Sequence, residues 1–263
     1  KMGMAFEPPD VYRGVYRFEP VNDKLIRYGL GAIKGTGQQA IEAIVAAREG
    51  CGEGPNGQER GPFTSLFNFC LRVDRTRLNK RTVEALIKAG AFDAIHLNRA
   101  ELLASLDMAF EYAATTQANA HQGGLFDLLG GDGVAGLGAS GEEPPLVAVT
   151  PWGVKERLTH EKSAIGFYFS GHLFDEVERE VRRFARTRLA DVVDSRDPVL
   201  LAGIVSDFRV INGQRGRLAF FKLDDKTAVL EVSADEHLIN THRALLKDDE
   251  LLVVQALAQP DRF

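Results

Sequence analysis

The sequence predicts a multidomain α+β protein in which a mainly helical region is followed by an all-β region. Its 263 residues are enough for two or three domains. Apolar side chains recur at helical spacing between residues 38 and 120, which is typical of amphipathic helices. From residue 199 the pattern changes to short runs rich in β-branched and aromatic residues, separated by turn residues, which is typical of strands.

The first 31 residues predict extended chain and two short strands. VYRGVYRFEP alternates aromatic and polar residues, and DKLIRYGLG at 23–31 looks like a strand that enters a turn. The stretch IKGTGQQAIEAIVAAREG then predicts a helix, because Ile41, Ile44 and Val45 recur at helical spacing. Residues 50–62 follow as a Gly-rich loop.

Three further helices are predicted. TSLFNFCLRVD at 64–74 is a helix that Thr64 would cap, because a hydroxyl can accept a hydrogen bond from a free amide of the first turn. LNKRTVEALIKAGAFDAI at 78–95 is a helix ended by Gly90. NRAELLASLDMAFEYAATTQANA at 98–120 is one long helix.

Residues 121–150 are a linker by composition, since GDGVAGLGASGEEPP offers almost nothing to pack. Residues 151–198 predict a helical connector that includes the charged amphipathic helix FDEVEREVRRF. Residues 199–263 hold three predicted strands, then the helix DEHLINTHRALLK, then the strand ELLVVQALAQ. That order predicts an OB-type barrel that stops before its last strand.

Bulk properties exclude several classes of protein. No run approaches 18 apolar residues and no secretory leader is visible, which argues against a membrane protein. The two cysteines, Cys51 and Cys70, form no disulfide framework and lack zinc-ligand spacing, so we expect a cytoplasmic location. The net charge of −5 argues against general nucleic-acid binding. Residues 72–88 nevertheless hold six basic and two acidic residues, which favours either phosphate contact or a solvated helix face.

A possible phosphate site lies where Lys34, Gly35, Thr36 and Gly37 open the first helix. Two glycines allow a tight turn that points successive N–H groups outward at a helix N-terminus, as in helix-hairpin-helix modules that hold the DNA backbone. Thr36 departs from the usual module, which has an apolar residue there. A plain strand-to-helix turn is the alternative. The basic residues downstream strengthen the DNA-binding interpretation, and the candidates are Arg75, Arg77, Asn79, Lys80 and Arg81.

The predicted barrel has its own candidates for DNA contact. OB folds often bind single strands through basic and aromatic side chains on their strands. An OB barrel used for protein contact is the alternative. The candidates are Arg209, Arg215, Arg217, Lys222 and one of Phe220 and Phe221, since neighbouring residues of a strand face opposite sides.

The stretch HQGGLFDLLG at 121–130 places apolar side chains where no core can form around them, which suggests a partner's surface. Gln122 could hydrogen-bond at the rim of a pocket while Leu125 and Phe126 fill it, and Gly123 and Gly124 keep the backbone adaptable. The alternative is a helix end whose apolar side chains fold back on the helix. We expect no catalytic residue, metal site or cofactor in this chain, because no Asp-x-Asp pair for two-metal chemistry is present and the histidines are scattered.

Taken in order, four segments and the PPDV at 8–11 resemble the C-terminal half of the bacterial DNA polymerase III alpha subunits, the replicative C-family polymerases. The segments are GLGAIKGTGQQAIEAIVAAR, GPFTSLFNFCLRVD, LNKRTVEALIKAGAFD and GFYFSGHLFDE. One departure is Leu173 after His172, where the family typically has proline. The loop at 50–60 also looks longer than usual.

The resemblance implies the end of the fingers region over 1–75, a tandem helix-hairpin-helix module over 76–120 and an incomplete OB domain over 199–263. It implies that Gln122–Phe126 docks on the sliding clamp, the beta subunit. The implied partners are primer–template DNA, single-stranded template and other polymerase III holoenzyme subunits, with no membrane. The catalytic aspartates and their Mg²⁺ would lie upstream. The alternatives are the error-prone paralogue and a free-standing clamp- or DNA-binding adaptor.

Overall fold

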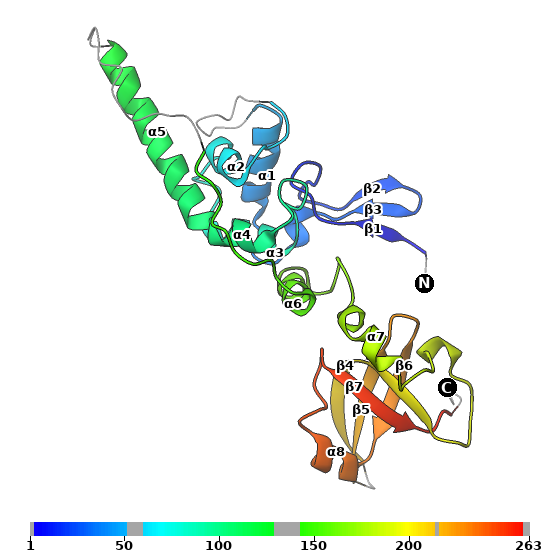
Figure 1. The fold of residues 1–263 in the computed structure, drawn as a ribbon. Helices are drawn as coiled ribbons and strands as arrows, with labels where there is room; N and C mark the ends of the chain where they lie inside the picture. Colours follow the sequence, from blue (N-terminus) through cyan, green and yellow to red (C-terminus); the bar gives the residue numbers. More distant parts are fainter. Residues whose placement is uncertain (1–2, 52–59, 129–142, 214–215, 260–263) are drawn as a thin grey trace. The chain divides into compact units, whose positions relative to one another are not determined.

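The computed structural model describes residues 3–51, 60–128, 143–213 and 216–259. The chain divides into two compact units, Lys1–Phe169 and Ser170–Phe263 (Figure 1). The first is mainly helical and the second contains a curled antiparallel sheet, which confirms the predicted α+β order. We describe each unit by itself.

The helical unit begins with a small three-stranded sheet. Its strands are β1 (Ala5–Glu7), β2 (Glu19–Asn22) and β3 (Leu25–Arg27). Their order is β1-β3-β2, with β1 parallel and β2 antiparallel to β3. The Arg27 guanidinium joins the outer strands, since it lies 3.0 Å from the Glu7 carboxylate and 3.5 Å from that of Glu19.

Six α-helices and one 3₁₀ turn follow in the described part of this unit. They are η1 (Leu30–Ala32), α1 (Gln38–Arg48), α2 (Leu66–Arg72), α3 (Lys80–Lys88), α4 (Arg99–Ala104), α5 (Leu106–Leu128) and α6 (Val154–Ile165).

Two expectations about helix ends were wrong and one is confirmed. Ser65, not Thr64, caps α2, because the Ser65 hydroxyl accepts from the Asn68 amide at 2.8 Å. The long helix expected over 98–120 is broken at Ser105, whose buried hydroxyl accepts from the Val147 amide at 2.8 Å. Gly90 does end α3, with a left-handed φ of 82°.

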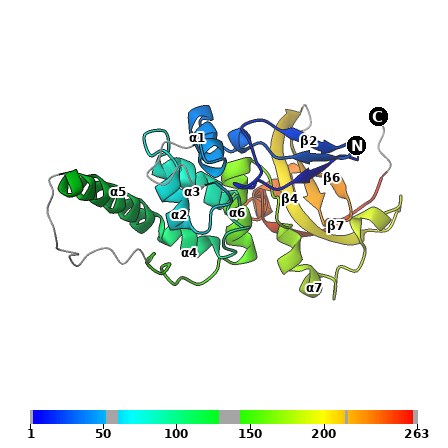
Figure 2. The same cartoon turned by 90° about the horizontal axis from the view of Figure 1, so that it is seen from above.

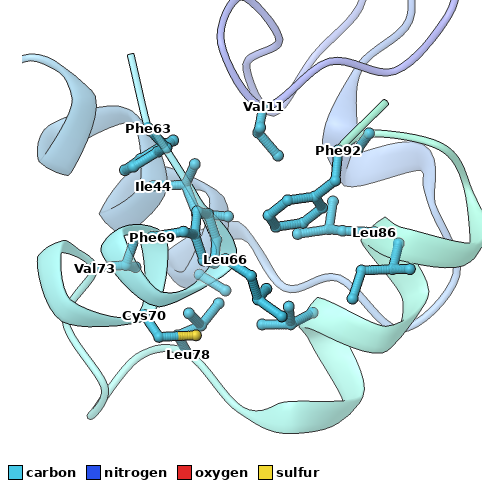
Figure 3. Close-up of a cluster of buried hydrophobic side chains, with 14 of the residues drawn as sticks. Val11, Ile44, Phe63, Leu66, Phe69, Cys70, Val73, Leu78, Leu86 and Phe92 are labelled. Atoms are coloured by element: carbon cyan, nitrogen blue, oxygen red, sulfur yellow. The ribbon is translucent and has the colours of Figure 1, made fainter. Parts of the chain in front are cut away.

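The core of the helical unit is built on an aromatic cluster between α1, α2 and α3. Phe69 makes edge-to-face contacts with Phe63 and Phe92, with ring centroids 4.9 Å and 4.8 Å apart. Leu66 and Leu86 are fully buried beside them, and Figure 3 shows these side chains pointing toward one another. Burying each side chain of this size contributes about 1.5–3 kcal/mol, so this cluster fixes how the three helices pack.

Helix α6 belongs to this core, which corrects the expectation of a separate connector over 151–198. Its Glu161 is fully buried and accepts from Arg99 at 2.7 Å and from the Phe169 amide at 2.9 Å. Arg99 also pairs with Asp93. Removing one partner from a buried pair leaves an uncompensated charge and costs about 3–5 kcal/mol. The pair therefore holds α6 against α4, and Asp93 joins it from the turn after α3.

The second unit is a curled sheet with short helical turns around it. Its elements are η2 (Leu173–Glu176), α7 (Glu178–Val181), η3 (Leu189–Asp191), β4 (Val199–Gly213), β5 (Gly216–Asp224), β6 (Val229–Ala234), α8 (Glu236–His242) and β7 (Leu251–Ala256). The charged helix expected over FDEVEREVRRF is thus a 3₁₀ turn followed by a single α-helical turn.

The strands pair in the order β6-β5-β4-β7, all antiparallel, and Figure 2 shows the long strand β4 bending with the sheet. A β-bulge between Ser206 and Arg209 accompanies this bend, and Asp207 within it has a left-handed φ of 55°. Phe221 and Leu223 fill the inner face. Three strands, a helix and a fourth strand beside the first confirm the expected OB-type half-barrel.

Candidate nucleic-acid interface

The first hairpin places Lys34–Gly37 at the N-terminus of α1, as the sequence predicted. Gly35 has a φ of 88°, a left-handed conformation that glycine adopts without strain. The Thr36 hydroxyl lies 2.8 Å and 2.7 Å from the carbonyl oxygens of Leu30 and Ile33, so it ties the turn together from inside. This contact explains how a threonine fits where an apolar residue was expected.

Gly37 has a different role from Gly35. It is the N-cap of α1, with an ordinary φ of −90°, so its backbone does not require glycine. A Cβ atom added at Gly37, as at Gly35, would meet no atom within 4 Å beyond its chain neighbours and the backbone of its own helix. The missing side chain therefore leaves open space directly in front of the helix N-terminus.

Two of the four amides of this turn are bonded within the protein and two have no acceptor in the described part of the chain. Lys34 donates its N–H to the Ala164 carbonyl of α6 at 2.8 Å, and Thr36 donates to Ile33. Within the described residues, the N–H groups of Gly35 and Gly37 have no acceptor, and those of the first turn of α1 have none either, as at any helix start. Free amides and the positive end of the helix dipole together form an anion site.

A second hairpin lies directly beside the first. Asn79 caps α3 by accepting from the Thr82 amide at 2.9 Å, which explains this asparagine structurally. The buried Thr82 hydroxyl donates to the Gly35 carbonyl at 3.3 Å. The N-termini of α1 and α3 are therefore neighbours, and they form what we call the paired hairpins (Lys34–Gly37 and Arg75–Arg81).

The basic side chains of the paired hairpins fall into two groups. Within the described residues, Lys34, Arg75 and Arg81 have no acidic partner. Arg77 lies 3.4 Å from Asp74, and Lys80 lies 2.5 Å from the exposed Asp107. The first group can add its full charge to a phosphate contact, whereas the second must exchange a partner.

Arg72 does not belong to the interface, which corrects the expected basic run at 72–88. It is 1% exposed and donates to the carbonyls of Ala47, Gly61 and Pro62 at 2.7, 3.0 and 3.2 Å. Its guanidinium also lies over the Phe63 ring, 4.8 Å from the centroid. Arg72 therefore serves as a buried brace beneath the hairpins.

The comparisons with known proteins agree with this geometry. Residues 3–102 match the sequence profile of a helix-hairpin-helix motif. The chain is 42% identical over 261 residues to the DNA polymerase III subunit alpha of Neisseria meningitidis serogroup B strain MC58, covering 99% of this chain and 21% of that protein. It is 38% identical to the Pseudomonas aeruginosa subunit over 281 residues and 34% identical to the Escherichia coli K12 subunit over 272 residues, in both cases over 100% of this chain.

The chain is homologous to a segment of the DNA polymerase III alpha subunit. It spans about a fifth of the length of these relatives, with 23% of the Pseudomonas protein and 22% of the Escherichia protein covered. The similarity extends through both compact units, so the paired hairpins and the half-barrel both lie in the part of the chain that matches these relatives.

On the half-barrel, the cations that were expected to contact DNA and that the structure describes are already paired. The side-chain nitrogen of each cation lies close to a carboxylate oxygen: Arg209 is 3.1 Å from Glu231, Arg217 is 2.9 Å from Glu236 and Lys222 is 2.5 Å from Asp207. Arg215 lies outside the described residues. Phe221 is buried in the core, and Phe220 faces the other side, with Arg209 over its ring at 5.8 Å. Of the two aromatics, only Phe220 is placed for contact with a ligand.

The Gln122–Phe126 motif lies on α5, where the sequence analysis expected a linker. The backbone of α5 stays helical to Leu128, and Figures 1 and 2 both show this end of α5 extending away from the rest of the helical unit. The side chains of these five residues are outside the described part of the structure.

Among the described residues, no group of three or more His, Cys, Asp or Glu side chains could hold a metal ion. No helix among the residues that the structure describes is long and apolar enough to span a membrane.

Proposed function

We propose that this chain is a non-catalytic, C-terminal part of a DNA polymerase III alpha subunit that holds primer–template duplex behind the active site. The observation that carries this proposal is the pair of adjacent helix N-termini, with unbonded amides at Gly35 and Gly37 and open space at Gly37. Such a surface suits the regularly spaced phosphates of a duplex and reads no bases. The Mg²⁺ needed for nucleotidyl transfer would be bound elsewhere in the whole polymerase.

The free and the partnered cations of the paired hairpins allow a matched test of duplex binding. Binding of this chain to a labelled duplex should weaken strongly in the double variant Lys34→Ala/Arg81→Ala, which removes two exposed cations without an acidic partner among the described residues. The double variant Arg77→Ala/Lys80→Ala should weaken it less, because those cations must first leave a carboxylate. The slope of log affinity against log salt should fall by about 0.9 for each phosphate that is no longer neutralised.

Two controls keep this test specific. Duplexes of different base sequence should be affected equally, because backbone contacts carry no base information. The chain alone should not extend a primer when it is given Mg²⁺ and deoxynucleotides. Template-dependent extension would overturn the non-catalytic assignment, and salt-independent or undetectable duplex binding at low salt would overturn the hairpin assignment.

We also propose that Gln122–Phe126 binds the sliding clamp and thereby tethers the polymerase to DNA. The motif supports this because it combines a Gln with Leu125 and Phe126 on the far end of α5 (Figure 1). Gly123 and Gly124 each cost a helix about 1 kcal/mol relative to alanine, so little free energy is needed to unwind this end onto a partner. Tethering raises the effective concentration of DNA at the enzyme without any new DNA contact.

The barrel unit would contact the single-stranded template. Its OB-type topology supports this, since such barrels commonly bind single strands through basic and aromatic side chains. Phe220 and Arg209 lie together on the outer face of β5 and β4, where a base could stack.

A further inference from the structure

The second unit carries a short loop whose two ends are held by one buried carboxylate. Asp225, in the turn between β5 and β6, is fully buried. Its Oδ2 accepts from the Arg182 guanidinium at 2.6 Å and from the Leu189 amide at 2.9 Å. Its Oδ1 accepts from the Thr227 amide and hydroxyl. Residues 182 and 189 are thus brought to the same oxygen atom, and we call the segment between them the arginine arch (182–189).

The arch is braced along its length as well as at its ends. Arg182 also donates to the Thr187 carbonyl at 3.1 Å and lies over the Phe174 ring, 5.1 Å from the centroid. Ala185 and Leu189 are buried. Compact loops with joined ends are often functional, and a braced loop loses little entropy when a ligand binds.

The remaining side chains of the arch point to solvent and carry free positive charge. Arg183, Arg186 and Arg188 are exposed, and none has an acidic partner within the described residues. Phe184, between them, is 55% exposed. In extended chain, Arg186 and Arg188 project on one side about 7 Å apart, which is comparable to the separation of successive phosphates along an extended single strand.

This arrangement contrasts with the outer face of the barrel. There, Arg209, Arg217 and Lys222 each pair with a carboxylate, so a phosphate would have to displace an existing partner. The arch offers three guanidinium groups that need no such exchange, together with an exposed ring. Guanidinium groups along a backbone and an aromatic ring for a base are the combination by which proteins hold single strands.

We propose that the arginine arch is a single-stranded DNA site, with Arg183, Arg186 and Arg188 on phosphates and Phe184 stacked on a base. The proposal rests on the single-strand role proposed for the barrel unit, but it assigns that role to different residues. Duplex DNA keeps its bases stacked inside, so Phe184 distinguishes single strands from duplex. An acidic peptide could satisfy the charges, but it would leave the exposed ring without a stacking partner.

The test compares two triple variants of the full 263-residue chain by fluorescence anisotropy with labelled oligo-dT. Arg183→Ala/Arg186→Ala/Arg188→Ala should reduce the slope of log affinity against log salt by about two, since each phosphate contact to a single strand contributes about 0.7. The matched control Arg209→Ala/Arg217→Ala/Lys222→Ala removes the same charge from the barrel face and should change the slope less. Circular dichroism and thermal unfolding confirm that each variant is folded.

Phe184→Ala gives an independent readout. It should weaken oligo-dT binding about five-fold or more, because stacking on a base contributes at least that factor, and it should leave duplex binding unchanged. An equal loss for duplex and single strand would overturn the stacking assignment. The remaining check is competition, in which polyglutamate of matched charge displaces oligo-dT. If polyglutamate displaces oligo-dT equally well from the parent chain and from Phe184→Ala, the ring does not contribute to holding the single strand. That result would favour an acidic peptide as the ligand and overturn the proposal.

The outcomes separate this proposal from the broader one. If the barrel-face variant loses oligo-dT binding while the arch variant keeps the parent's affinity and slope, the arch proposal is refuted and the single-strand role of the barrel stands. If the parent chain does not bind oligo-dT at low salt, both fail.

Discussion

The two glycines of the first hairpin can be separated experimentally, because one serves the fold and the other leaves room for a ligand. Both positions have open space where a Cβ atom would lie, but Gly35 sits at φ 88°, whereas Gly37 has an ordinary φ. Alanine at each position tests whether that open space is where DNA binds. The two substitutions add the same methyl group two residues apart.

The expected effects on stability differ in size. Gly35→Ala places a Cβ atom in the left-handed region and should lower the free energy of unfolding by about 1–2 kcal/mol. Gly37→Ala loses some N-cap preference, typically below about 1 kcal/mol. It regains about 0.4–1 kcal/mol because the unfolded chain becomes less flexible. Its net effect on stability should therefore be close to zero, as urea unfolding can measure.

The expected effects on duplex binding run the other way. The new methyl group at residue 37 would stand in front of the free amides and keep a phosphate from approaching them. Losing one charge-assisted hydrogen bond costs about 1.5–3 kcal/mol, so duplex affinity should fall by roughly ten- to a hundred-fold at fixed salt. Fluorescence anisotropy with a labelled duplex measures this. A folded Gly37→Ala protein that binds duplex as tightly as the parent would refute the hairpin as the phosphate site.

Three further predictions follow from single side chains. Arg72→Ala should lower the free energy of unfolding by about 3 kcal/mol or more in urea unfolding, because it leaves three carbonyl groups without their hydrogen-bond donor and opens a cavity. A loss below about 1 kcal/mol would contradict the role of Arg72 as a buried brace. Phe126→Ala should weaken clamp binding by one to two orders of magnitude in calorimetry, since burying this side chain contributes about 1.5–3 kcal/mol, and the Gln122→Ala/Leu125→Ala double variant should weaken it too; parent-like binding by folded variants would move the clamp site elsewhere. Burial opposes ionisation of Asp225, but hydrogen bonds from Thr227, Arg182 and two amides outweigh it and lower its pKa to about 2. The contribution of Asp225 to the free energy of unfolding should therefore be fully present above about pH 4 and decline toward pH 2. Asp225→Asn should flatten that decline.

The local pattern of residues in the sequence was enough to predict the main secondary-structure elements of both units. The hairpin at Lys34–Gly37, the end of α3 at Gly90 and the succession of strands and helix along the half-barrel all depend on residues close together in sequence. Each has a local cause, namely glycine at a left-handed position or period-two alternation along a strand. Such causes can be found in a single sequence.

The misplaced features depend on contacts between distant residues. Ser105 breaks the long helix because its hydroxyl meets the amide of Val147, 42 positions away. Arg72 is buried because carbonyls of two other segments converge on it, and the longest of these contacts spans 25 residues. The docking of α6 through Glu161 and Arg99 spans 62 residues. A run of charges in the sequence does not reveal which of its members will be enclosed in this way.

Charge alone therefore does not rank the candidate DNA contacts, whereas the pairing of each cation does. An exposed ion pair contributes only about 0–1 kcal/mol to stability, so pairs such as Lys80–Asp107 can open. The cation of such a pair must nevertheless leave its carboxylate before it can bind a phosphate. Unpaired guanidinium and ammonium groups carry no such cost. In the described part of a chain of net charge −5, the paired hairpins and the arginine arch each carry several cations without an acidic partner. One surface offers amides for an intact duplex and the other an exposed ring for a separated strand, so the two should differ in which form of DNA they hold.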